Sequence, residues 1–372
     1  MKALLFLITV FTLNTRIAAC QEKAFELNGT INIDTDSMKL IMNGDSSLYP
    51  KSVRNLTSPI INGKFKFKSN LPYPLAYRLL AKNNGFMSDV IVLEPGIQSV
   101  ICNTDSTRKM PKVNNIVMQE YVRYREKTKK FINKQNAFDN EYKVLIARYP
   151  EGIPDTLKLK MERETQAQND ESDKNLLAFI RENPRSYWAL WRLIHLTEFG
   201  YEKIFDEMMP LFDNSIKTSY LGKHVFNVLQ KSNILAVGNQ FPQMNLLQIY
   251  GNQSPRIPFK SKKYTLVDFW YTTCLPCIKT FPGLVDIYRQ YKIKGFEIAG
   301  ISVDALKYQN DLPIVIKKQN LTWAQYWDVG GKGSKDLSIQ AYPTNFLVDS
   351  DGIIIHKNIR NAELAVFLKE NL

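Results

Sequence analysis

The chain has few of the residues that build disulfide scaffolds or metal centres. Its 372 residues include four cysteines and only three histidines, which are scattered at His195, His224 and His356. A structural zinc site needs four ligands and a disulfide scaffold needs several cysteine pairs, so neither is predicted. A c-type haem site needs a histidine directly after Cys-x-x-Cys, and Ile278 stands there. We therefore expect no metal and no cofactor.

The sequence also lacks blocks of one charge. The formal net charge is +13 at pH 7, yet Lys and Arg are spread along the chain with no run of five or more. No nucleic-acid motif accompanies this charge, so we expect no nucleic-acid partner; a basic surface suits an anionic membrane face or acidic partners. Hydrophobic residues at 44% and charged residues at 23% are typical of a soluble globular protein, and the length predicts two or three domains.

Long apolar runs are missing after the N-terminus, where no stretch is long enough for a transmembrane helix. Lys2 and the apolar residues 3–13 are typical of a secretory signal sequence. We predict that residues 1–19 are a signal peptide that is removed from the mature protein.

The end of this segment, Ile17-Ala18-Ala19-Cys20, resembles a bacterial lipobox, in which the cysteine is lipidated. Arg16 and Ile17 depart from the usual pattern, so an ordinary signal peptide with an incidental Cys20 stays open. Lipidation of Cys20 would anchor the chain in the cell envelope. Gln21 is not the Asp that marks inner-membrane retention, which slightly favours the outer membrane.

Residues 20–110 read as a small all-β domain. Runs rich in β-branched and apolar residues predict strands at 25–33, 38–42, 64–67, 75–81 and 90–93, with Asn-Gly and Pro-Gly turns between them. Strands at this spacing suggest a small sandwich or barrel-like domain. Cys102 lies in another strand-like run, either as a buried inert thiol or as a partner for a mixed disulfide.

Residues 111–236 read as a helical connector of four or five helices. Ser186 can cap a helix that carries Trp188, Trp191 and Ile194, an apolar stripe that we interpret as helix–helix core. The strongly polar residues 164–173 are predicted to be mobile. From residue 237 to 372 strands and helices alternate, which predicts a central sheet with parallel pairs and flanking helices.

The motif Cys274-Leu275-Pro276-Cys277 stands where a predicted strand turns into a predicted helix. A dithiol there can close a small disulfide loop. The partial positive charge of the helix N-terminus stabilises a thiolate on the first cysteine, and the thiolate is the nucleophile in disulfide exchange. The motif therefore predicts redox chemistry.

Several motifs occur together in this last segment: Val267-Asp268-Phe269-Trp270, Cys274-Leu275-Pro276-Cys277, Pro282, Ala341-Tyr342-Pro343-Thr344 and Phe346-Leu347-Val348-Asp349. In this order they resemble the thioredoxin fold, and more narrowly the TlpA/ResA type of thiol-disulfide oxidoreductase. A looser resemblance over residues 1–236 is to lipoproteins of that group. The implied fold class is multidomain, with a C-terminal α/β thioredoxin fold after the all-β domain and the helical connector.

The resemblance implies a role for each site residue. Cys274 would be the exposed attacking thiolate, and Cys277 would be buried and would resolve the mixed disulfide. Pro276 fixes the turn and removes one donor to the thiolate. Pro343 would be a cis-proline facing the dithiol, and the backbone of its neighbour Tyr342 would pair with a substrate segment. Trp270 would pack beside the dithiol.

Asp268 is the predicted acid/base residue. In thioredoxin an Asp at this position is buried and moves the proton of the resolving cysteine, which a raised pKa permits near neutrality. The TlpA/ResA type more often has a Glu three residues after its second cysteine, where this chain has Thr280. A solvated Asp268 at the end of the strand is the alternative.

We expect a periplasmic, membrane-anchored oxidoreductase that reduces disulfides in envelope proteins, with a membrane thiol carrier as the electron donor that the resemblance implies. An oxidase or isomerase could use the same residues. A peroxidase would want Thr where Tyr271 stands. A non-catalytic binding lipoprotein, with residues 21–236 as its working part and a structural disulfide, also stays open.

Overall fold

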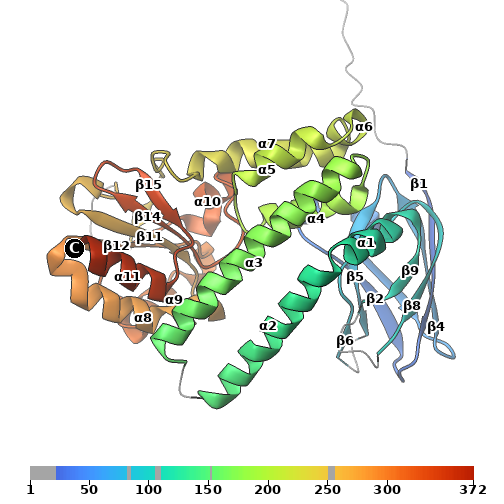
Figure 1. The fold of residues 1–372 in the computed structure, drawn as a ribbon, viewed down its shortest axis with the longest axis horizontal. Helices are drawn as coiled ribbons and strands as arrows, with labels where there is room; N and C mark the ends of the chain where they lie inside the picture. Colours follow the sequence, from blue (N-terminus) through green and yellow to red (C-terminus); the bar gives the residue numbers. More distant parts are fainter. Residues whose placement is uncertain (1–21, 82–84, 105–109, 151–152, 250–255) are drawn as a thin grey trace, which may run out of the picture. The chain divides into compact units, whose positions relative to one another are not determined.

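The computed structural model describes residues 22–81, 85–104, 110–150, 153–249 and 256–372 (Figure 1). The predicted signal peptide and Cys20 lie outside these residues. The chain divides into two compact units, Met1–Met118 and Gln119–Leu372. The predicted domain boundaries at residues 19, 110 and 236 stay predictions.

The first unit is built from strands. They are β1 (Lys23–Ile31), β2 (Ser37–Met42), β3 (Asn55–Pro59), β4 (Lys64–Leu71), β5 (Leu75–Ala81), β6 (Phe86–Met87), β7 (Ile91–Leu93), β8 (Gly96–Cys102) and β9 (Lys112–Asn114). One sheet has the order β4-β1-β8-β9, and the other has the order β3-β2-β5-β6 with β7 paired to β5. The predicted β-rich domain is confirmed, although the sequence pattern misses β3 and the very short β6 and β9.

Strand β4 shows why these residues form a sheet with one buried face. Phe65 and Phe67 are buried and alternate with the exposed Lys64, Lys66 and Lys68. Successive side chains of a strand point to opposite faces, so this alternation gives β4 an apolar face and a solvated face. The two phenylalanine rings meet edge to face at 5.8 Å.

Helices follow the strands. They are α1 (Ile116–Lys127), α2 (Lys129–Arg148), α3 (Asp155–Glu182), α4 (Tyr187–Thr197), α5 (Ile204–Leu211), α6 (Asn214–Lys217) and α7 (Tyr220–Ser232). Seven helices in the described residues correct the prediction of four or five, because α1 and α2 are separate and α6 is a single turn. The prediction that residues 164–173 are mobile is wrong. They lie inside α3, whose 28 residues include no Gly or Pro and bury Met161, Gln168 and Leu176 along one side.

The aromatic stripe of α4 packs as helix–helix core, as the sequence predicts. Ser186 is the N-cap and accepts a hydrogen bond from the backbone N–H of Ala189 at 3.0 Å. Trp188 lies against the rings of Tyr124 in α1 and Phe179 in α3, at centroid distances of 4.7 and 5.6 Å. These contacts hold three helices of the second unit together.

Strands and helices then alternate to the C-terminus. They are β10 (Leu247–Gln248), β11 (Tyr264–Trp270), α8 (Leu275–Tyr291), β12 (Phe296–Ser302), α9 (Asp311–Lys318), β13 (Ala324–Trp327), α10 (Lys332–Asp336), β14 (Thr344–Asp349), β15 (Ile354–Lys357) and α11 (Asn361–Asn371). A 3-10 turn, η7 (Leu306–Tyr308), precedes α9, with a turn at Gln309 and Asn310 between them.

The sheet has the order β10-β13-β12-β11-β14-β15. β11 pairs in parallel with β12 and antiparallel with β14. Leu266 and Trp270 of β11 lie in an apolar cluster with residues of α8, while Val267 and Phe269 lie in a second cluster on the other face. This mixed sheet with flanking helices is the α/β arrangement that the sequence predicts for residues 237–372. None of the helices in the described ranges has the length and apolar composition needed to cross a bilayer.

Candidate active site

The two cysteines lie at the turn between β11 and α8. Cys274 is the N-cap residue of α8, and its sulfur accepts a hydrogen bond from the backbone N–H of Cys277 at 3.1 Å. The two residues form a disulfide, with their Cα atoms 5.3 Å apart. Pro276, in the first turn, has no N–H to donate. A thiolate on Cys274 would be stabilised here, because the helix N-terminus carries a partial positive charge.

The prediction of an exposed Cys274 is wrong for this disulfide form. Cys274 is 1% exposed and Cys277 is fully buried. Cys274 belongs to the apolar cluster of Trp270, and the partly buried rings of Tyr271 and Tyr342 pack against that cluster. The exposed part of the motif is its middle, where Leu275 is 69% exposed.

Asp304 holds the turn that precedes Cys274. Its carboxylate accepts hydrogen bonds from the backbone N–H of Thr272 at 2.9 Å, the Thr272 hydroxyl at 2.7 Å and the Ser302 hydroxyl at 2.8 Å. Its carbonyl accepts from the indole of Trp327 at 2.8 Å. Asp304 was not predicted as a site residue. Asp304 follows the end of β12, which pairs with β11 in parallel. The carboxyl ends of two parallel strands lie at the same edge of the sheet, so this position could have indicated a site residue.

Asp268 lies on β11, two residues before Trp270 and two after Leu266. Because side chains alternate along a strand, its carboxyl points to the face that carries the cluster of the two cysteines. It is 2% exposed, and desolvation raises the pKa of this carboxyl to about 7. The alternative of a solvated Asp268 is therefore wrong, and a carboxyl with this pKa can exchange a proton near neutral pH.

The peptide bond between Tyr342 and Pro343 is cis, as the resemblance implies. The ring of Tyr342 meets the ring of Tyr271 edge to face at 5.6 Å. This contact places the cis-proline loop beside the Cys-x-x-Cys turn. Desolvation raises the pKa of Tyr342 to about 12, so its hydroxyl stays protonated at neutral pH.

Trp270 and Thr280 surround the cysteines from the strand and the helix. Trp270 is 1% exposed, meets Phe281 edge to face at 5.5 Å and donates from Nε1 to Oε1 of Gln325 at 3.3 Å. The hydroxyl of Thr280 donates to the carbonyl of Cys277 at 2.8 Å. Thr280 therefore contacts the resolving cysteine but has no carboxylate to take its proton.

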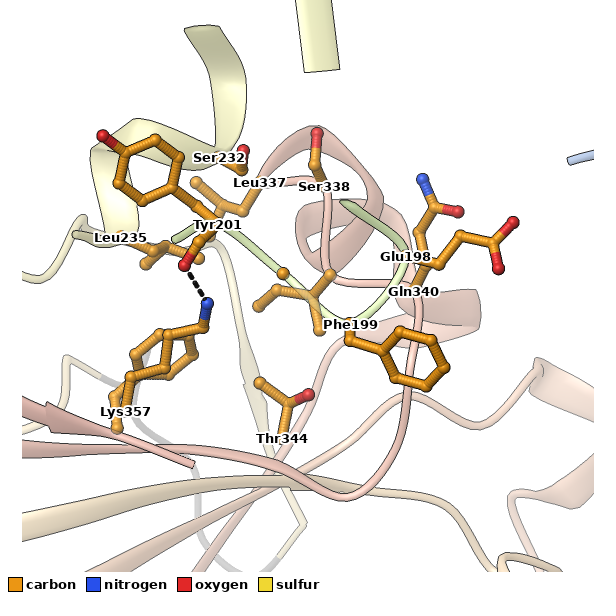
Figure 2. Close-up of a pocket in the computed structure, with 13 residues that line it drawn as sticks. Glu198, Phe199, Tyr201, Ser232, Leu235, Leu337, Ser338, Gln340, Thr344 and Lys357 are labelled. Carbon is orange, nitrogen blue, oxygen red and sulfur yellow. Dashed lines mark hydrogen bonds between the residues drawn. The ribbon is translucent and has the colours of Figure 1, made fainter. Parts of the chain in front are cut away.

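A small cavity lies next to the cis-proline loop (Figure 2). Its volume is about 10 Å³, which is room for roughly one water molecule. Lys357 of β15 lines one side of it and donates to the carbonyl of Tyr201 (Figure 2). Its lining includes Gln340 and Thr344 but neither cysteine. The cavity is thus part of the packing between the helices and the sheet and is too small for a substrate.

Cys102 belongs to β8 of the first unit. It is 2% exposed, and desolvation raises the pKa of its thiol to about 12. A thiol with this pKa has almost no thiolate at neutral pH, so its structure agrees with the interpretation of a buried inert cysteine.

Comparisons with known proteins agree with this geometry. Residues 237–357 match the AhpC/TSA family. Over 129 residues the chain is 30% identical to the thiol-disulfide oxidoreductase ResA of Bacillus thuringiensis subsp. konkukian (strain 97-27), covering 34% of this chain and 72% of that protein. It is 26% identical over 136 residues to the thioredoxin-like protein YneN of Bacillus subtilis (strain 168), covering 36% of this chain and 79% of that one.

Solved structures match the same part of the chain. The thioredoxin domain of a thiol-disulfide oxidoreductase from Bacteroides vulgatus is 29% identical, with 37% of this chain and 97% of that chain covered and a TM-score of 0.33. The sequence relatives and the disulfide at the start of α8 together identify the C-terminal region as a thiol-disulfide oxidoreductase domain. The chain belongs to the ResA/TlpA-type thiol-disulfide oxidoreductases of the AhpC/TSA thioredoxin-like family.

Proposed function

We propose that this oxidoreductase reduces protein disulfides through Cys274 and Cys277. The observation that carries the proposal is the placement of this cysteine pair at the N-terminus of α8, beside the cis-proline loop. Pro276 supports the direction, because it withholds one hydrogen-bond donor from the Cys274 sulfur. A less stabilised thiolate makes the dithiol form less stable and the pair a better reductant.

The reaction has two exchange steps. The Cys274 thiolate attacks one sulfur of the substrate disulfide; the substrate S–S bond breaks, a bond between Cys274 and the substrate forms, and the other substrate sulfur leaves as a thiolate. The Cys277 thiolate then attacks the Cys274 sulfur and releases the second substrate sulfur. Two electrons pass to the substrate, which takes up two protons, and the enzyme is left with its disulfide.

Asp268 is proposed as the proton acceptor for Cys277. Before the second step the S–H bond of Cys277 breaks, and the proton passes to the Asp268 carboxylate. A carboxyl with a pKa of about 7 is ionised in a substantial fraction of molecules at neutral pH and can also return the proton. Thr280 cannot replace it, because a hydroxyl is a far weaker base than a carboxylate.

The substrate-binding role is proposed for Trp270, Pro276, Tyr342 and Pro343. The backbone beside Pro343 would pair with an extended substrate segment, which aligns a disulfide with Cys274. Trp270 and Tyr342 would support this position through their packing around the dithiol. Substrates of this kind are disulfide-containing proteins of the cell envelope.

The location is proposed from the N-terminal sequence. Removal of residues 1–19 and lipidation of Cys20 would leave a lipoprotein that faces the periplasm, with the outer membrane slightly favoured over the inner. The domain at 20–110 and the connector at 111–236 would then separate the lipid from the thioredoxin-like domain at 237–372. A thiol carrier in the membrane would return electrons to the Cys274–Cys277 disulfide.

The test is catalytic reduction of a disulfide-bonded protein such as insulin by the chain from residue 21 onward, with dithiothreitol as the source of electrons. We expect turnover above the rate with dithiothreitol alone, loss of turnover in Cys274→Ser and retention in Cys102→Ala. Equal rates with the wild type and Cys274→Ser would contradict the proposal. That result would favour a binding lipoprotein with a structural disulfide.

A further inference from the structure

A row of three polar residues and one glycine crosses the sheet on the face that carries the two cysteines. Asp268 of β11 is paired in register with Gly300 of β12 and with Asn345 of β14, and Gly300 is paired with Gln325 of β13. Residues paired directly across neighbouring strands share a face. All four positions are therefore on the face that carries α8 and the cysteine cluster, where apolar side chains otherwise dominate.

The side-chain amide of Gln325 is buried and only half satisfied. Gln325 is 2% exposed. The indole N–H of Trp270 donates to Oε1, which fixes the end of the amide that carries oxygen. Nε2 has no hydrogen-bond partner among the described residues. An unpaired buried donor is unfavourable, so this Nε2 is free to serve an acceptor close by.

Gly300 determines where this amide lies. A Cβ atom built on Gly300 would be 2.5 Å from Oε1 of Gln325 and 2.9 Å from its Nε2. The amide thus fills the space above Gly300 that a side chain would occupy. Gly300 is the direct neighbour of Asp268 in the row, and neighbouring strands are about 4.8 Å apart. The free donor of Gln325 therefore lies about one strand spacing from Asp268.

The Asp268 carboxyl has the complementary need. It is buried, and desolvation is the cause that raises its pKa; no charge or hydrogen-bond donor among the described residues acts to lower it. The unpaired Nε2 of Gln325 and the Asp268 carboxyl are on one face, on either side of Gly300, which has no side chain. The unpaired Oδ1 of Asn345 is next to Asp268 in the same row.

Few other titratable groups face this row. The buried ones on the helices packed over this face are Cys274, Cys277, Tyr288 and Tyr291, and all belong to the α8 region. The charged side chains of α8, α9 and α11 are exposed. His356 of β15 lies against Phe367, and the Asp304 carboxylate is occupied by Thr272 and Ser302.

We propose that Gln325 is a positioning residue for the proton of Asp268. When the Asp268 carboxyl ionises, Nε2, which has no partner in the structure, gains an acceptor and donates toward it, and so favours the form that accepts the Cys277 proton. Trp270 holds the amide in the required orientation, and Gly300 leaves the space for it. This inference rests on the proposed function, in which Asp268 is the base for Cys277.

The test is the pH profile of disulfide exchange. The reduced chain is mixed with a small aromatic disulfide between pH 5.5 and 9.5, and oxidation is followed by tryptophan fluorescence in single turnovers. We expect the rate of the wild type to rise with a midpoint set by Asp268, below the pKa of about 7 that desolvation alone gives this carboxyl. Gln325→Leu removes the donor, so its midpoint moves upward by about one pH unit, with about tenfold slower exchange below the midpoint.

Two further variants make the result specific. Gly300→Ala displaces the amide while keeping Gln325, and it should shift the midpoint in the same direction. In an Asp268→Asn background, Gln325→Leu should have no further effect on the profile, because the proton that it positions is absent. Gln290→Leu, at an exposed position of α8, should behave as the wild type.

The outcomes separate the two proposals. A wild type that exchanges disulfides, with midpoints unmoved in both Gln325→Leu and Gly300→Ala, overturns the role of Gln325 and leaves the proposed function standing. A uniform loss of rate at all pH values in folded Gln325→Leu also overturns it, because a merely structural role gives that result. A wild type with no exchange at any pH overturns the proposed function itself.

Discussion

The backbone N–H of Cys277 points at the sulfur of Cys274, with 3.1 Å between nitrogen and sulfur. The resolving residue therefore already supplies the hydrogen bond that an N-cap side chain accepts from the third position of its helix. The second position is Pro276, which cannot donate. The Cys274 sulfur therefore has one backbone N–H donor, although the first turn of a helix can supply two. The missing donor limits the stabilisation of the Cys274 thiolate.

Replacing the resolving cysteine should trap the substrate. In Cys277→Ser the first exchange still forms a bond between Cys274 and the substrate, but no second thiolate is present to break it. We expect mixed disulfides with envelope proteins that are visible on non-reducing gels and disappear with dithiothreitol. Cys274→Ser/Cys277→Ser is the matched control and should trap nothing; equal trapping by that variant would place the reactive thiol elsewhere, at Cys102.

Restoring the missing donor should make the pair more oxidising. Pro276→Ala adds a backbone N–H at the start of α8, and a hydrogen bond to a charged group contributes about 1.5–3 kcal/mol. This stabilises the reduced form and raises the reduction potential by about 30–60 mV. Equilibration with glutathione buffers measures the change. Pro313→Ala in α9, remote from the cysteines in sequence, should leave the potential unchanged, and an unchanged potential in Pro276→Ala would remove this explanation.

Burial of Asp268 should cost stability at high pH. The folded protein keeps the proton up to about pH 7 while the unfolded chain loses it near pH 4, so stability falls as the pH rises through this window. The difference between the two pKa values corresponds to about 4 kcal/mol as an upper value. Asp268→Asn removes the charge and should raise the free energy of unfolding by up to that amount at pH 8.

Urea unfolding of the disulfide form at pH 8 and at pH 4.5 checks this expectation. At pH 4.5 the gain in Asp268→Asn should fall to about 1 kcal/mol, because this pH is close to the pKa of the unfolded carboxyl and far below that of the folded one. The exposed Asp336→Asn in α10 is the control and should show no such pH dependence. A gain of equal size at both pH values would mean that Asp268 does not hold its proton in the folded protein.

Lys357 should contribute to the stability of the second unit. Its side chain is 9% exposed and lies 3.7 Å from Glu202, and its ammonium group donates to the carbonyl of Tyr201 (Figure 2). Lys357→Ala removes the donor to this partly buried carbonyl, and we expect a loss of about 1–3 kcal/mol in urea unfolding. Lys369→Ala in α11 is exposed and should be neutral. Equal stability of the two variants would mean that water replaces the lysine at no cost.

Much of the site could be predicted because most of its residues belong to short sequence motifs. The cysteine pair, Pro276, Asp268 and Pro343 each belong to a local motif, and motifs of this kind mark turns and strand ends. The central strands of the thioredoxin-like fold follow from short apolar and β-branched runs, which are typical of strands buried on both faces. The exposure of Cys274 was predicted wrongly, because Cys274 belongs to a buried apolar cluster whose members come from strands and helices far apart in the sequence.

Other features depend on tertiary structure. Gln325 and Gly300 lie on separate strands, and only their register with Asp268 gives them a shared position. Asp304 likewise acts through Thr272 on a different loop. In α3 the polar residues 164–173 gave no apolar stripe to indicate a helix, although the absence of Gly and Pro permitted one and packing of Met161 and Leu176 stabilised it.

The reduction potential of the Cys274–Cys277 pair tests the central claim most directly. Equilibration of the wild type against thiol buffers, followed by Trp270 fluorescence, gives the value. A reductase should have a potential near that of thioredoxin, about −270 mV. A potential between about −180 and −120 mV would contradict the account, because a pair that oxidising would transfer disulfides to its substrates as an oxidase or isomerase.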